Sequence, residues 1–189
     1  MSSNSYKKVG LELAAALCVN KAMTRLNIAY CGVQDEDTIT KLKLSTGQIG
    51  PNAVQYFVKA FKYNKTVTSF DMVFDPMQDD DWNCLADLLK VNETLTSLKV
   101  LVSDTKEREF QHLVNALSEN KTLTSINCWS TNKPFPGLKC FADILPDNTT
   151  LTTLDLESND VDDKGVKFLA DALKTNKVWY LLSLPHEQF

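Results

Sequence analysis

The chain has 189 residues, 43% hydrophobic and 23% charged, which is ordinary for one globular domain with a substantial core. Its formal net charge of -4 argues against a nucleic-acid partner, because binding to phosphates normally needs a basic surface. No apolar run reaches the ~18 residues that a membrane helix requires, so no membrane partner is expected either.

The cysteine content favours a reducing compartment. There are five cysteines, an odd number, and they are not closely spaced: Cys18, Cys31, Cys84, Cys128 and Cys140. This pattern does not predict a disulfide framework. We therefore expect a cytoplasmic protein, with translocation into a host cytosol as an effector as the alternative.

Residues 1–35 are expected to form an N-terminal helix and an irregular first repeat. Leu13, Ala16 and Leu17 have the i, i+3, i+4 spacing of one helical stripe. The same segment resembles the apolar part of a secretion signal, but Glu12 interrupts it. The connector from Cys31 to Asp37 is too short for a helical crossover, which allows a cap with an antiparallel first strand.

The rest of the chain repeats with a constant period of 28 residues. The repeats align on an Asn-x-Thr motif, and we call its first residue the anchor; it is Asn64, Asn92, Asn120 and Asn148. The same step reaches Glu36 in one direction and Asn176 in the other. Fixed self-similarity at this period is the signature of a solenoid. We therefore expect five units in residues 36–175, followed by a terminal strand and tail in residues 176–189.

Each unit combines a strand with a helix. Apolar residues at the sixth and eighth positions after the anchor, such as Leu98 and Val100, predict a strand with one buried face. Apolar residues seven, four and three positions before the anchor, such as Leu113, Ala116 and Leu117, predict an amphipathic helix.

These units must stack, because one strand and one helix cannot bury their apolar faces alone. Short parallel strands are expected on the inner, concave side and helices on the outer, convex side. The acidic runs Asp79–Asp81 and Asp162–Asp163 mark helix starts, where the helix dipole favours negative charge.

The segment Leu151-Thr-Thr-Leu-Asp-Leu-Glu-Ser-Asn159 matches the LxxLxLxxN pattern of leucine-rich repeats. Together with the helical pattern up to Leu173, it resembles the ribonuclease-inhibitor-like subfamily, which includes the recognition ends of nucleotide-binding immune receptors and the activator of the Ran GTPase. The resemblance implies an α/β leucine-rich-repeat solenoid, a curved horseshoe, as a single domain over residues 1–189. The other units replace Asn159 by different residues, so irregular turns are expected after the central strands.

No motif of an enzyme is present: the chain lacks a GxxxxGK[ST] phosphate loop, a CxxC pair and an HExxH sequence. Cys84, His112 and Cys140 share one repeat position, which suggests a metal site on paper. Neighbouring helices lie about 8–10 Å apart, however, whereas zinc ligands must lie ~2.0–2.3 Å from one ion. We expect no catalytic residue, no metal and no cofactor.

Candidate binding residues lie on the face of the sheet that strand alternation leaves exposed. They form two rows across the strands: a charged row at the seventh position after the anchor and an apolar row at the ninth. The charged row contains Lys43, Asp71, Lys99, Asn127 and Asp155. The apolar row contains Val73, Leu101 and Trp129, and the candidate Glu157 follows at the same position of the next unit.

The apolar row is a candidate binding patch, because strands ~4.8 Å apart bring its members side by side. An exposed tryptophan is also a common hot spot of interfaces. The alternative is local packing, since Phe74 and Val102 follow on the buried side. The charged row either recognises a partner or serves solubility.

The sequence thus predicts a non-catalytic protein–protein interaction module that binds a partner protein through its concave face, as an adaptor, inhibitor or effector. The alternatives are a recognition fragment of a larger nucleotide-binding receptor and a GTPase-regulating protein. No helix follows the last predicted strand to cover the preceding unit. Because solenoids normally need caps, self-association through this uncapped C-terminal edge is a further option.

Overall fold

The computed structural model describes residues 23–27, 37–45, 53–62, 64–73, 77–101, 107–130, 135, 137–156, 159–178 and 181–184. Several sequence-based expectations lie outside these residues. They concern the N-terminal helix around Leu13–Leu17, most of the connector after Cys31, the turns that follow the central strands, and Glu157.

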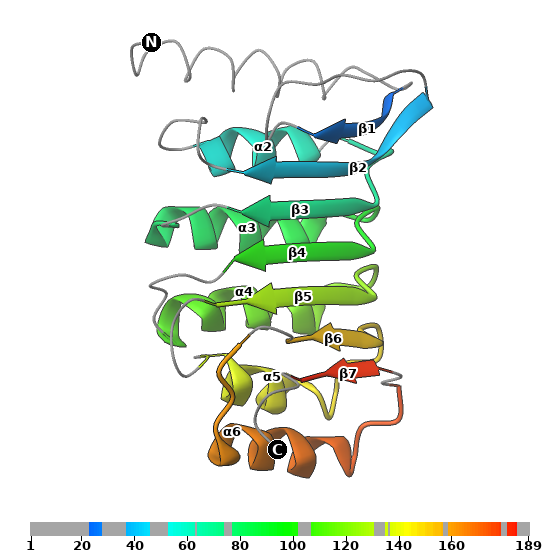
Figure 1. Ribbon diagram of the computed structural model, residues 1–189. Coiled ribbons are helices and arrows are strands. Elements are labelled where there is room, and N and C mark those ends of the chain that lie inside the picture. Colours follow the sequence, from blue (N-terminus) through cyan, green and yellow to red (C-terminus); the bar gives the residue numbers. More distant parts are fainter. Residues whose placement is uncertain are drawn as a thin grey trace.

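Seven strands form one parallel sheet in which every strand pairs with its neighbours in chain order (Figure 1). They are β1 (Met23–Asn27), β2 (Asp37–Ser45), β3 (Ser69–Val73), β4 (Ser97–Leu101), β5 (Ser125–Trp129), β6 (Thr153–Asp155) and β7 (Leu181–Ser183). From β3 onward, each paired residue lies beside the residue 28 positions later in the sequence, on the next strand. This register confirms the period.

The antiparallel first strand that the sequence allowed is wrong, because β1 runs parallel to β2, with register shifts between Met23 and Arg25. In this pairing Met23 lies beside Asp37 and Asn27 lies beside Lys43.

Five described helices alternate with the strands and lie together on one side of the sheet (Figure 1). They are α2 (Ala53–Phe61), α3 (Asp79–Val91), α4 (Glu107–Glu119), α5 (Leu138–Ile144) and α6 (Asp163–Leu173). Asp79–Asp81 occupy the first turn of α3, and the Asp162 carboxylate accepts a hydrogen bond from the Gly165 N–H at the start of α6. Both acidic runs therefore mark helix starts, as predicted.

The core lies between the helices and the sheet. The sixth- and eighth-position side chains of β3 to β6 are all 0% exposed: Phe70, Met72, Leu98, Val100, Ile126, Cys128, Leu154 and Leu156. Helix residues seven positions before the anchor meet them: Leu85, Leu113, Phe141 and Leu169 are at most 1% exposed. Both predicted hydrophobic periods are confirmed. Helices need more room than strands, so the sheet lines the inner side of the stack.

The anchor asparagines tie each unit to the one before it. Asn92 Oδ1 accepts hydrogen bonds from the backbone N–H groups of Thr94 and Leu95, while its Nδ2 donates to Phe61 O. Asn120, Asn148 and Asn176 donate in the same way to Leu89 O, Leu117 O and Leu145 O. Backbone groups that the repeat buries thus find partners, a role that the sequence alignment alone did not predict.

Close approach between helices depends on two buried glycines. A Cβ atom on Gly137 would lie 2.2 Å from Cε1 of Phe110, and one on Gly165 would lie 2.1 Å from Cδ1 of Leu138. Phe110 and Leu138 occupy equivalent positions of successive units. A glycine at the start of the following helix therefore lets their large side chains fill the space between helices.

Candidate binding surface

The face of the sheet opposite the helices, here the open face, carries the charged row without a break. Backbone register places Lys43, Asp71, Lys99, Asn127 and Asp155 directly beside one another across β2 to β6. Lys43 is exposed, and the other four residues are partly exposed. The structure therefore brings together the five residues that the repeat pattern placed in this row.

Charges in the row do not neutralise one another at its β2–β4 end. Asp71 has a lysine in register on each side, yet within the described residues it forms no ion pair with Lys43 or Lys99. Lys99 instead places its ammonium 5.2 Å from the ring centroid of Trp129, in a cation–π contact. At the other end, Asn127 Nδ2 donates to the Asp155 carboxylate.

The apolar row is only partly a surface. Val73 and Trp129 are partly exposed, but Leu101 is 7% exposed, so the expectation of an exposed Leu101 is wrong. Leu101 and Trp129 are register partners on strands ~4.8 Å apart, close enough for the indole to cover the leucine. Leu101 is thus part of the buried interior, whereas Val73 and Trp129 are partly exposed.

The Trp129 indole is held with its polar atom inward. Its Nε1 is buried and has no hydrogen-bond partner, although the residue as a whole is partly exposed. A buried donor without a partner costs about 1–3 kcal/mol.

Hydroxyl side chains line the other side of the charged row. Ser69, Ser97, Ser125 and Thr153 are in register across β3 to β6, and all are partly exposed. These side chains are short, so they extend less far from the sheet than the Trp129 side chain on the opposite side of the charged row.

The described cysteines are unsuited to nucleophilic chemistry. Burial, with a smaller contribution from Glu107, raises the pKa of the Cys140 thiol to about 11. Burial likewise raises the pKa values of Cys128 and Cys84. A thiol that stays protonated at neutral pH is a poor nucleophile. Among the described residues, no group of three His, Cys, Asp or Glu side chains could hold a metal ion.

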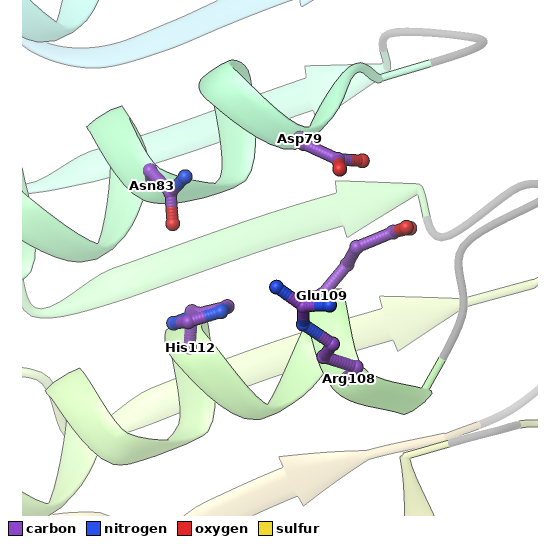
Figure 2. Close-up of a pocket in the computed structure, with 5 residues that line it drawn as sticks. All are labelled: Asp79, Asn83, Arg108, Glu109 and His112. Carbon is purple, nitrogen blue, oxygen red and sulfur yellow. The ribbon is translucent and has the colours of Figure 1, made fainter.

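A small open hollow on the helical side has mixed character. It has a volume of about 140 Å³ and lies between α3 and α4, lined by Asp79, Asn83, Arg108, Glu109 and His112 (Figure 2). Its side chains carry both signs of charge, and Arg108 and His112 are exposed. This arrangement does not bring a nucleophile and a base together.

No helix in the described part of the chain is long and apolar enough to span a membrane.

Comparison with known proteins agrees with this architecture. A family model described as "Leucine Rich repeat" matches residues 147–170, from the Asn148 anchor into α6. The structure "Leiomodin-1 Actin-Binding Site 2" is similar with a TM-score of 0.66, at 21% identity over 87% of each chain. The tropomodulin C-terminal domain of Caenorhabditis elegans is similar with a TM-score of 0.60, at 11% identity over 93% of each chain. No curated protein sequence matches significantly.

The fold is that of a leucine-rich-repeat solenoid. The matched segment contains the one unit with Asn159 at the end of its LxxLxLxxN pattern. Asn159 is buried, and its Nδ2 donates to Cys128 O of the preceding unit and to Leu156 O. In this unit the asparagine that ends the LxxLxLxxN pattern thus forms a hydrogen bond to the preceding unit.

The C-terminal end of the solenoid leaves an apolar stripe uncovered. In α4, the three residues that face the next helix, Phe110, Val114 and Leu117, are at most 2% exposed because α5 packs on them. Their counterparts in α6 are Val166 and Leu173, which are partly exposed, and Ala170, which is exposed. The last strand shows the same loss of burial, because Leu182 and Leu184 are partly exposed, whereas their counterparts Leu154 and Leu156 are 0% exposed.

Proposed function

We propose that the chain is a non-catalytic protein–protein interaction module that binds a partner protein through its open face, as an adaptor, inhibitor or effector. The observation that carries the proposal is the charged row beside Trp129. It presents Lys43, Asp71 and Lys99 without ion pairs among them, next to a partly exposed aromatic ring. Aromatic side chains bordered by polar groups are typical interface hot spots.

Actin is the first partner to test. Its support is the fold similarity to the structure of actin-binding site 2 of leiomodin-1. The assay is the binding of purified monomeric and filamentous actin to the purified protein.

The position of the site is tested by a pair of matched aromatic substitutions. Phe168 on α6 is also partly exposed and also lies beside a lysine, with Lys164 Nζ 5.9 Å from its ring centroid, but it is on the helical side. Trp129→Ala should weaken partner binding by roughly 2 kcal/mol or more, as for a desolvated hot spot. Phe168→Ala should leave the affinity unchanged. Equal losses in both variants would contradict binding through the open face.

Several finer features are also proposed. Membership of the ribonuclease-inhibitor-like subfamily rests on the helical half of the unit ending at Leu173. A recognition fragment of a larger receptor and a GTPase regulator rest on analogy with that subfamily. A GTP-hydrolysis assay tests the regulator, and cell fractionation tests the cytoplasmic location.

Self-association is proposed for the uncovered stripe on α6, with a second copy as the occupant. In the stripe the small Ala170 lies between the larger Val166 and Leu173. Two antiparallel α6 helices can therefore meet with Ala170 at the centre, as an isologous contact requires. Sedimentation equilibrium of the wild type and of Ala170→Glu measures this. A monomeric wild type at high concentration would contradict the dimer.

A further inference from the structure

The charged row has a direction and a spacing that restrict what can lie on it. It crosses the strands at right angles and follows the stacking direction of the units, because each member is in register with the next. Adjacent strands are ~4.8 Å apart. Lys43, Asp71 and Lys99 therefore present positive, negative and positive charges at steps of about 4.8 Å, over a length of about 9.6 Å.

An α-helix matches these steps and an extended strand does not. Helix residues i, i+4 and i+7 lie on one face, and at 1.5 Å per residue they span about 10.5 Å. Residues on one face of a strand recur only every ~6.6–6.8 Å, so an extended peptide laid along the row falls out of step by the third charge. The short hydroxyl side chains of Ser69, Ser97 and Ser125 leave a shallow surface beside the charged row, and a helix can lie on this surface.

We infer that the open face binds an α-helix of the partner, lying along the stacking direction, with an acidic, a basic and an acidic residue one turn apart. The acidic residues contact Lys43 and Lys99, and the basic residue contacts Asp71. The inference rests on the proposed function, since it names the chemistry of the partner at the same face. Trp129 lies on the opposite side of the charged row from the serines and contacts the Lys99 ammonium there.

Two peptides of equal composition test whether the row distinguishes charge order. Both are alanine-rich, held helical by a hydrocarbon staple on the opposite face, and differ only at positions i, i+4 and i+7. One carries Glu, Lys and Glu, and the other carries Glu, Glu and Lys, so their net charges are equal. Each exposed ion pair contributes modestly, and we expect the first peptide to bind about ten-fold more tightly. Fluorescence anisotropy of labelled peptide measures the affinities.

A charge exchange on the protein provides the decisive arm. Asp71→Lys together with Lys99→Asp should reverse the preference, so that the Glu-Glu-Lys peptide binds more tightly. The matched control exchanges the exposed ion pair of Lys65 and Glu93, whose Nζ and Oε2 atoms are 3.7 Å apart, by Lys65→Glu with Glu93→Lys. It lies outside the row and should leave the preference unchanged. If thermal denaturation shows that the first exchange prevents folding, Lys43→Glu at an exposed site should still reduce binding of the Glu-Lys-Glu peptide several-fold.

The outcomes separate this inference from the proposed function. Equal binding of both peptides, or a preference that the charge exchange leaves unchanged, overturns the helix inference. If the effect of Trp129→Ala on protein partners then persists, the open face still binds proteins, but not by this charge order. If neither the peptides nor protein partners respond to open-face substitutions, both proposals fail.

Discussion

Replacing one anchor asparagine should uncouple two units of the solenoid. Asn120 is 4% exposed, and its Oδ1 accepts from the N–H groups of Thr122, at 2.9 Å, and Leu123, at 2.7 Å. Its Nδ2 donates to Leu89 O at 2.6 Å. Asn120→Ala removes these three hydrogen bonds, each worth about 1 kcal/mol net, together with two longer ones that join the side chain to Thr122 Oγ1 and Asn92 O. It also leaves buried groups without partners at a further cost. We expect a loss of about 3–5 kcal/mol in the free energy of unfolding.

Urea denaturation followed by circular dichroism measures this loss. Lys121→Ala, at the exposed neighbouring residue, is the control and should change stability by less than about 0.5 kcal/mol. Asn120→Asp separates the two halves of the side chain, since it keeps the acceptor but loses the donor to Leu89 O. A loss below about 1 kcal/mol for Asn120→Ala would refute the reasoning, because the hydrogen bonds would then be replaced by water at little cost.

Three further predictions concern packing, pH and thiol reactivity. Gly137→Ala should lower the free energy of unfolding by about 1–3 kcal/mol, because the added Cβ would overlap the Phe110 ring. Thermal unfolding measures this change, with Ala142→Gly as a control for the size of the substitution. Burial raises the pKa of Asp81 above its ordinary value of 3.8, so its favourable contribution is present below that pH and lost as pH rises through the folded-state pKa. Asp81→Asn should therefore gain stability relative to the wild type as the pH rises above 3.8. A stability difference that stays constant with pH in urea titrations would show that Asp81 does not titrate as buried. In the native protein, partly exposed Cys84 should react with iodoacetamide before buried Cys128 and Cys140, as peptide mass mapping would reveal; equal rates would contradict the burial of the latter two.

Much of the fold was predictable because the same hydrophobic pattern recurs in several units of the sequence. The pairs Leu98 with Val100 and Leu154 with Leu156 recur at one spacing, so the buried face of each strand was clear from the sequence, and all four are 0% exposed. The first unit was harder, because its short step breaks the period. The orientation of β1 was therefore left open, and the parallel pairing with β2 settles it.

The binding surface was less predictable than the core. Periodicity assigns a side chain to one face of the sheet, but it does not show how large neighbours cover each other. Leu101 and Val73 occupy the same repeat position, yet Leu101 is buried and Val73 is partly exposed; the register partner of Leu101 on the next strand is Trp129. The contact between Lys99 and Trp129 joins a residue of the charged row to a residue of the apolar row on the next strand. The sequence pattern, which treats each row separately, does not predict such a contact.

Partner capture from a native lysate tests the central claim most directly. The wild type, Trp129→Ala and Phe168→Ala are immobilised at equal density, and bound proteins are compared by quantitative mass spectrometry. Binding through the open face predicts at least one protein that the wild type and Phe168→Ala retain and Trp129→Ala loses. A set of bound proteins that is the same for all three, or that is lost only with Phe168→Ala, would contradict it.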